Sequence, residues 1–239
     1  MKTRQLRTAL LPTLAAIAGL TVASPSAEAV VNEVVANNGS QTFFDPNIST
    51  TDLINVGAPT LGSFTTSVVP SFGALGTHNG TGGDPSNTTG LGYWSNSPSG
   101  VVLTYTLTGS ATGYDITSIN SIYGWRDSAL RHAAQRYTVS FATLANPAFT
   151  PYHTVLYDPF TTNVQASTQV TLTDTTGLLA TGVTGIRFNL TSDNGTEVGV
   201  VHELDVFGRA TAAAVPEPAT AALSLLALGG LARRRRRIA

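Results

Sequence analysis

The stretch Val101-Val102-Leu103-Thr104-Tyr105-Thr106-Leu107-Thr108 alternates apolar and polar residues with a period of two. In a β-strand, side chains two positions apart point to the same face of the sheet. The four apolar side chains would therefore lie on one face and the threonines on the other. The stretch predicts a strand with one buried face and one solvated face.

The same alternation recurs along the chain, and turn-forming pairs such as Asn38-Gly39 and Asp158-Pro159 separate its occurrences. Charged residues make up only 11% of the chain, and no long segment between residues 30 and 209 has a helical period. These features predict a single all-β domain, an antiparallel β-sandwich of jelly-roll type. The predicted strands cover residues 30–35, 60–69, 101–108, 114–123, 137–141, 152–157, 164–173, 186–190 and 198–207.

The composition argues against several classes of protein. The chain of 239 residues contains no cysteine, which excludes a disulfide framework, thiolate metal sites and a thiol nucleophile. Between residues 30 and 209 there are five arginines and no lysine against twelve acidic residues, whereas nucleic-acid binding needs a cationic face. The chain also lacks the Gly-x-Ser-x-Gly and His-Glu-x-x-His patterns of hydrolases. We therefore expect no catalytic residues and no nucleic-acid partner.

The N-terminus has the features of a secretory signal peptide. Three basic residues precede the apolar run 9–23, and Ala27-Glu28-Ala29 offers small residues at the two positions that signal peptidase recognises. A membrane anchor is the weaker interpretation, because Pro12 interrupts the run and a bilayer span needs about 20 apolar residues. We expect signal peptidase to cleave after Ala29.

The C-terminus has three parts in a defined order. Pro216-Glu217-Pro218 comes first, and the apolar stretch 219–232 follows it as a predicted helix. Fourteen residues at about 1.5 Å each reach about 21 Å, less than a hydrocarbon core of about 30 Å, which favours a temporary insertion in the inner membrane. Basic residues that stay on the cytoplasmic side end the segment: Arg233, Arg234, Arg235, Arg236 and Arg237.

This order resembles the PEP-CTERM sorting signal of Gram-negative bacteria. The resemblance implies that an exosortase cleaves near residues 216–218 and transfers the protein to the cell surface or the extracellular matrix. A basic run can also bind nucleic acid, but its position directly after an apolar helix favours the sorting signal. The predicted organisation is a signal peptide at 1–29, a β-sandwich domain at 30–209 and a sorting segment at 210–239.

Five motifs in the predicted domain occur in an order similar to that of the discoidin, or F5/8 type C, family. They are Tyr114-Asp115-Ile116-Thr117-Ser118-Ile119, Tyr123-Gly124-Trp125-Arg126-Asp127, Gln135-Arg136-Tyr137-Thr138-Val139-Ser140, Gly185-Ile186-Arg187-Phe188 and His202-Glu203-Leu204-Asp205-Val206-Phe207-Gly208. That family has a galactose-binding-like jelly roll. The resemblance implies a module that binds carbohydrate, with an extracellular polysaccharide as its partner.

Two loop regions carry the candidate ligand-binding residues. Residues 76–100 contain seven glycines around Tyr93 and Trp94, whose rings can stack on a sugar ring. The second region contains Trp125, Arg126 and His132, which are side-chain types that sugar sites use. Structural interpretations remain open for both regions: Trp94 and Trp125 can belong to the core, and an ion pair within residues 127–131 can close the second loop.

The resemblance also implies a structural calcium ion. In calcium-bearing relatives of this fold, a carboxylate on the last strand and oxygens from an early loop bind the ion, so Glu203 and Asp45 are the candidate ligands. The alternative is that Glu203 is an exposed carboxylate on an edge strand.

The expected function is that of an exported, non-enzymatic protein that binds carbohydrate through loops of the sandwich. A first alternative is a structural component of the extracellular polymer without a small ligand. A second alternative is a polysaccharide hydrolase, in which Glu203 and Asp205 would converge in a cleft.

Overall fold

The computed structural model describes residues 30–38, 48–66, 78–80, 92–93, 100–125, 133–158, 166–191 and 200–213. For residues 38, 92, 93, 125 and 166 it describes the backbone alone. The strands within these ranges are β1 (Val31–Asn38), β2 (Leu61–Thr66), β3 (Gly92–Tyr93), β4 (Val101–Leu107), β5 (Tyr114–Trp125), β6 (Gln135–Thr143), β7 (Thr150–Tyr157), β8 (Ala166–Asp174), β9 (Ala180–Leu190) and β10 (Val200–Ala210).

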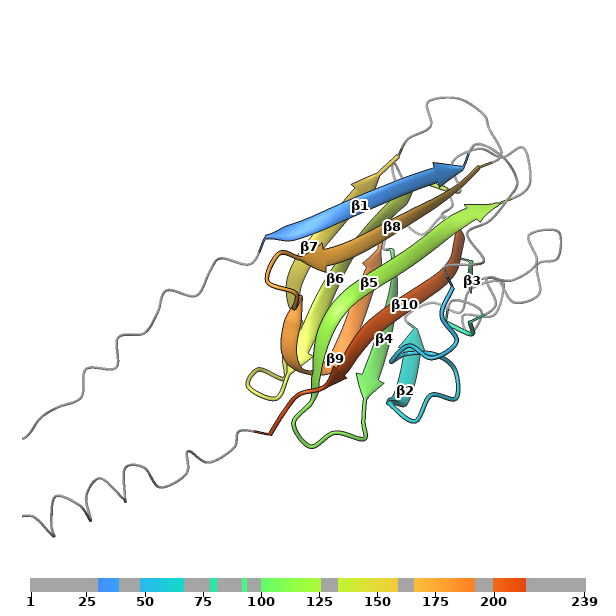
Figure 1. Cartoon of the computed structure of the whole chain (residues 1–239). Helices are drawn as coiled ribbons and strands as arrows, with labels where there is room; N and C mark the ends of the chain where they lie inside the picture. The colour runs from blue at the N-terminus through green and yellow to red at the C-terminus, as the bar shows by residue number, and fades with distance from the viewer. Residues whose placement is uncertain are drawn as a thin grey trace, which may run out of the picture.

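The strands form two layers, which lie one in front of the other in Figure 1. The front layer has the order β1-β8-β5-β10-β3, and the back layer has the order β2-β4-β9-β6-β7. Every pairing is antiparallel, and the first residues of β5 also pair with β9, which joins the layers at one end. The predicted antiparallel β-sandwich is confirmed.

The core lies between the two layers and follows the alternation of the sequence. In β4, Leu103 and Tyr105 are buried at 2% and 0% exposure, whereas Thr106 between Tyr105 and Leu107 is exposed. Ile186 and Phe188 of β9 are also fully buried. Burying one such side chain contributes about 1.5–3 kcal/mol to the free energy of unfolding. The buried faces predicted from the sequence therefore supply much of the stability.

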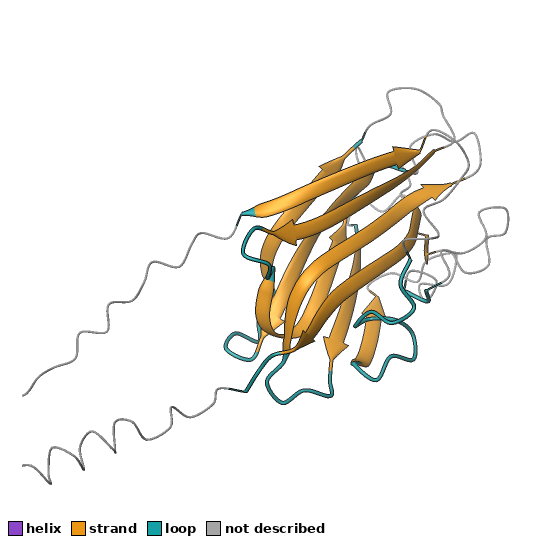
Figure 2. Cartoon of the chain, in the orientation of Figure 1, coloured by secondary structure: helices purple, strands orange, loops and turns teal. Residues whose placement is uncertain are grey.

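The nine predicted strands correspond to β1, β2 and β4–β10. β3 was not predicted, because two residues within a glycine-rich stretch carry no periodicity. Figure 2 shows strands and loops in the described part of the chain and no helix. The predicted C-terminal helix lies outside the described residues, and no helix among those described is long and apolar enough to cross a membrane.

The two ends of the sandwich carry different parts of the chain. We call one of them the terminal end. There the amide of Thr175 donates to the carbonyl oxygen of Val30 at 3.2 Å, and the amide of Thr211 donates to the carbonyl oxygen of Gly113 at 2.9 Å. The described chain therefore begins and finishes at this end (Figure 1). At the other end, the loop end, β5 finishes at Trp125 and β10 begins at Val200.

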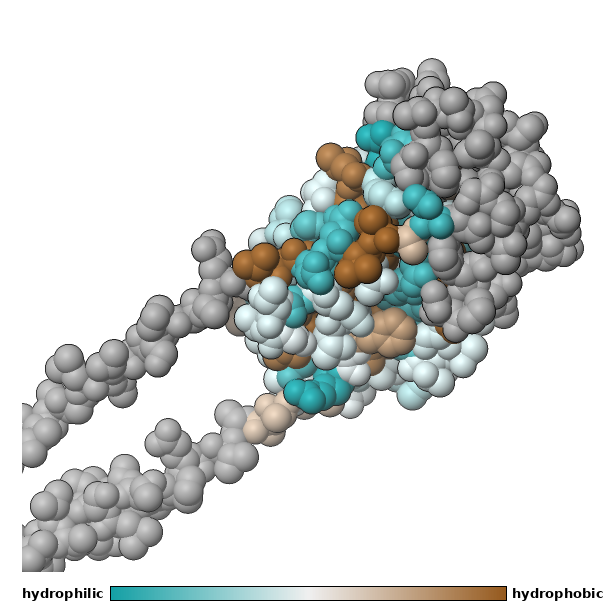
Figure 3. All heavy atoms as spheres, turned by 45° about the horizontal axis from the view of Figure 1, so that its top comes forward, coloured by the Kyte–Doolittle hydropathy of each residue, from teal (hydrophilic) through white to brown (hydrophobic). Residues whose placement is uncertain are grey.

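Apolar side chains are scattered over the described surface. The exposed ones include Val34 on β1, at 53%, and Leu156 on β7, at 66%. In the described part of the face shown in Figure 3, polar side chains separate the apolar ones. Single exposed apolar residues of this kind are ordinary in soluble domains.

Candidate functional site

The backbone brings both predicted ligand-binding regions to the loop end. Tyr93 of β3 pairs with Val200 of β10, and Tyr123 of β5, two residues before Trp125, pairs with Val201. β10 thus lies between the two regions, which are distant in sequence. The segments that contain Trp94, Arg126 and His132 lie outside the described residues, and the roles of all five side chains stay predictions.

A buried polar network lies beneath this end, and its centre is Gln135 at the start of β6. The side chain of Gln135 is 0% exposed. Its amide oxygen accepts a hydrogen bond of 2.6 Å from Ser121 Oγ, and its amide nitrogen donates to the carbonyl oxygens of Ser121 and Thr168 at 3.2 and 3.1 Å. Ser121 Oγ also lies 2.9 Å from the hydroxyl of Tyr137. Buried polar groups satisfied in this way specify one arrangement of the strands.

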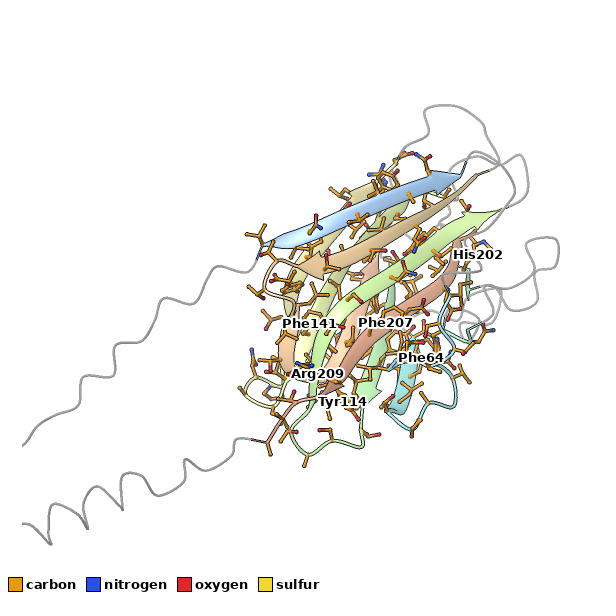
Figure 4. All side chains as sticks on the ribbon, in the orientation of Figure 1. Phe64, Tyr114, Phe141, His202, Phe207 and Arg209 are labelled. Atoms are coloured by element: carbon orange, nitrogen blue, oxygen red, sulfur yellow. The ribbon has the colours of Figure 1, made fainter. Side chains whose placement is uncertain are left out.

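The same region holds the described residues on both sides of the segment that contains Arg126 and His132. His202 of β10 (Figure 4) lies with its Nε2 2.5 Å from the carbonyl oxygen of Gly124. Because a carbonyl only accepts, Nε2 carries the proton in this bond. On the other side of this segment, Thr168 Oγ1 donates to the carbonyl of Ala133. Sequence reasoning missed this network, although Ser121 and Gln135 are polar residues at core positions of their strands.

Burial governs the ionisation of the tyrosines in this network. Burial raises the pKa of Tyr137 and of Tyr123 well above the usual value, and the bond from Ser121 only partly offsets this for Tyr137. The two rings are stacked with centroids 6.2 Å apart. Both residues therefore stay neutral and serve to pack and position the loop end.

Three buried carboxylates connect β10 to segments that come early in the chain. The amide of Gly80 donates to Glu203 Oε1 at 3.0 Å, and the amide of Ser49 donates to Asp205 Oδ2 at 3.2 Å. Asp52 Oδ1 accepts from the amide of Val206 at 3.3 Å. Glu203 and Asp205 are both 0% exposed, so the interpretation of Glu203 as an exposed edge carboxylate is wrong. The reason is tertiary, because early segments pack over β10.

Burial dominates the electrostatics of this cluster. It raises the pKa of Asp205 to about 7, and the nearby Asp52 raises it further, while the amide of Ser49 and the side chain of Asn120 lower it. Burial likewise raises the pKa of Asp52 to about 6 against the lowering effect of backbone amides. No lysine or arginine among the described residues forms an ion pair with either aspartate. Negative charge at this site is therefore poorly compensated within the described part of the chain.

The cluster has the oxygen chemistry that calcium prefers, but the described side chains do not complete a site. No group of three or more histidine, aspartate or glutamate side chains among the described residues could hold a metal ion. Glu203 offers a buried carboxylate, and Asp45 lies outside the described residues. The calcium site stays a prediction.

The hydrolase alternative needs carboxylates that a polymer can reach. Glu203 and Asp205 lie two residues apart in β10, as expected, yet both are fully buried. Their amide partners come from the early segments that cover them. A polysaccharide outside the protein cannot contact this pair.

The C-terminal segment was compared with known protein families. Residues 214–237 match the PEP-CTERM protein-sorting motif. The match contains Pro216, Glu217, Pro218 and the five arginines, as predicted from the sequence. The motif implies export and a surface or extracellular location in Gram-negative bacteria. It follows directly after residue 213, the last described residue, which continues from the terminal end of the sandwich.

The structure was also compared with solved structures, while a search of curated proteins found no match. It is similar to the F5/8 type C domain of a Bacteroides fragilis protein, at 10% identity and a TM-score of 0.40, covering 62% of this chain and 91% of that one. It is similar to the family 32 carbohydrate-binding module of Clostridium perfringens NanJ, solved with galactose, at 13% identity and a TM-score of 0.37. That match covers 62% of this chain and 97% of the module. It is also similar to the lectin domain of lectinolysin, solved with Lewis B antigen, at 9% identity and a TM-score of 0.43. That match covers 70% of this chain and 100% of the lectin domain.

Proposed function

We propose that the chain is an exported, non-enzymatic protein that binds carbohydrate at the loop end of its sandwich. The observation that carries the proposal is the placement of β3 and β5 on either side of β10 at that end. It brings the backbones of Tyr93 and Trp125 to the same end of the sandwich, and we propose that aromatic and cationic side chains of the two regions meet there. Aromatic faces with a few polar groups are what a sugar ring needs.

The arrangement of the two ends supports this function. The sorting motif follows the terminal end, whereas the candidate ligand residues belong to the loop end. While the tail is inserted in the inner membrane, the loop end would therefore face away from it. Signal peptidase and exosortase are the proposed processing partners, and the cell surface or extracellular matrix is the destination.

Retention on a polysaccharide array tests the proposal. We expect the exported chain to bind at least one neutral glycan, and the separate variants Tyr93→Ala, Trp94→Ala and Arg126→Ala to weaken that binding at least tenfold. Thr175→Ala, an exposed change at the terminal end, serves as the matched control and should bind as the wild type does. A folded chain that is retained on no glycan would contradict the proposal and leave the structural role in the matrix.

We also propose that Glu203 is one ligand of a structural calcium ion, with Asp45 as a second. A ligand that binds only the folded state at a hundred times its Kd contributes about 2.7 kcal/mol, so calcium should raise the Tm by about 5–10 °C over EDTA. Glu203→Gln should abolish the increase. Glu33→Gln, at a carboxylate on β1 that pairs with His153, should retain it. An equal Tm in calcium and in EDTA would contradict this proposal.

A further inference from the structure

The two layers of the sandwich carry opposite charges. The strands of the back layer contain two arginines, Arg136 and Arg187, and no aspartate or glutamate. The strands of the front layer contain one arginine, Arg209, and five acidic residues: Glu33, Asp115, Asp174, Glu203 and Asp205. An anionic ligand would therefore meet less repulsion on the back layer than on the front.

Arg187 lies at the centre of the outer face of the back layer. Its neighbours in sequence, Ile186 and Phe188, are fully buried in the core, so Arg187 projects from the opposite side of β9. Across the sheet it pairs with Thr104 of β4 and Ser140 of β6. The position is thus surrounded by hydroxyl side chains on both neighbouring strands.

The guanidinium of Arg187 is held in place by two contacts. Its Cζ lies 3.9 Å from the centre of the Phe149 ring, and its Nε donates to Thr104 Oγ1 at 3.3 Å. Gly185 leaves room for the ring, because a Cβ at that position would lie 3.0 Å from Phe149 Cζ. A guanidinium positioned by stacking and a hydrogen bond loses little freedom when it binds a ligand.

Arg187 differs from Arg136 in having no carboxylate partner among the described residues. Arg136 forms an ion pair of 3.5 Å with Asp158. Among the described residues, Arg187 donates its hydrogen bond through Nε, which leaves both terminal nitrogens for another acceptor. Those two nitrogens form one edge of the planar group, and a carboxylate can accept from both at once.

We propose that the outer face of the back layer, around Arg187, binds the carboxylate-bearing sugars of an acidic polysaccharide. The terminal nitrogens of Arg187 donate to the sugar carboxylate. Thr104, which is half-buried, and the exposed side chain of Asn189, two residues along β9, lie where hydroxyl groups of the same polymer can bond. This surface is separate from the loop end, and the inference does not depend on the function proposed there.

Affinity electrophoresis of the exported chain tests the inference, with polygalacturonate as the probe and the same polymer after reduction of its carboxyl groups as the neutral counterpart. We expect the wild type to bind polygalacturonate at least tenfold more tightly than the reduced polymer. Arg187→Gln should lower the affinity for polygalacturonate at least tenfold, and Arg187→Lys should lower it less, because charge remains while the two-pronged geometry is lost.

Two further variants guard against a folding defect and against general charge effects. Asn189→Asp leaves Arg187 intact but adds a carboxylate to the same face, and it should lower the affinity at least threefold. Arg209→Gln removes an equal charge from β10 of the front layer (Figure 4) and should leave the affinity within twofold. Equal binding by the wild type and Arg187→Gln would overturn the inference. An equal loss with Arg209→Gln, or equal binding to the reduced polymer, would overturn it too.

Discussion

The burial of Asp205 predicts that this residue makes the fold less stable as the pH rises. Its folded pKa of about 7 lies above the unfolded value of 3.8. Between these values the folded chain keeps the proton while the unfolded chain releases it, so each pH unit lowers the free energy of unfolding by about 1.4 kcal/mol. The contribution is fully present below pH 4 and is lost by about pH 7. The whole effect is therefore about 4 kcal/mol.

Asp52 and His78 also titrate in this interval, so the wild-type curve alone does not isolate Asp205. Asp52, with a pKa raised to about 6, acts in the same direction. Burial lowers the pKa of His78 from 6.5 to about 4, so that residue makes the fold more stable as the pH rises from 4 to 6.5. The difference between a variant and the wild type cancels most of these contributions.

Asp205→Asn is the variant of choice, because an amide oxygen can still accept the bond from the amide of Ser49. Urea unfolding in EDTA at pH 5, 6, 7 and 8 gives the free energy of unfolding of each protein. We expect the stability of the variant, relative to the wild type, to increase by about 3 kcal/mol from pH 5 to pH 8. Asp158→Asn, at an exposed carboxylate, should show no such increase. Parallel curves for Asp205→Asn and the wild type would refute the reasoning.

Three further changes test other parts of the structure. Gln135→Leu should cost about 3–5 kcal/mol in urea unfolding, because it leaves several buried partners of the amide without a hydrogen bond; a cost below 1 kcal/mol would show that the network is not needed. Hydrogen bonds from the hydroxyls of Thr181 and Thr211 lower the pKa of Asp115. Asp115→Asn should therefore lower the free energy of unfolding by about 2 kcal/mol at pH 7 and by progressively less as the pH falls below 3.8. A loss that does not change with pH would contradict this. Gly113→Ala should lower the Tm far more than Gly177→Ala, although φ is positive at both positions. A Cβ at residue 113 would lie 2.5 Å from the Gly182 backbone, whereas a Cβ at residue 177 would meet nothing within 4 Å. Equal Tm values for the two variants would contradict the steric argument.

The candidate ligand residues show how far prediction from sequence could go. A glycine-rich stretch around Tyr93 and Trp94 and the aromatic and cationic side chains after β5 identified two regions, and the backbone places both at the loop end. The network beneath that end was not predicted, because Gln135 bonds to Ser121 and Thr168, which lie 14 and 33 residues away. Such partners become visible only when the pairing of β5 with β8 and the position of β6 are known.

The buried carboxylates of β10 show where prediction from sequence failed. Glu203 on the last strand was predicted to be either a metal ligand or an exposed carboxylate, and its burial was not foreseen. Glu203 is buried because Gly80 and the segment before β2 pack against β10, and nothing in the residues around Glu203 encodes that contact. The stack of Phe149 on Arg187 is likewise a meeting of a turn and a strand that are far apart in the chain.

Strand alternation and the two terminal segments could be recognised in the chain itself, since both depend on the order of neighbouring residues. A period of two follows from the geometry of one strand, and a sorting motif is a linear pattern. Burial, ionisation and the charge difference between the layers could not be recognised in that way. They depend on which strands become neighbours, and that is settled by contacts across the whole sandwich rather than by any local stretch.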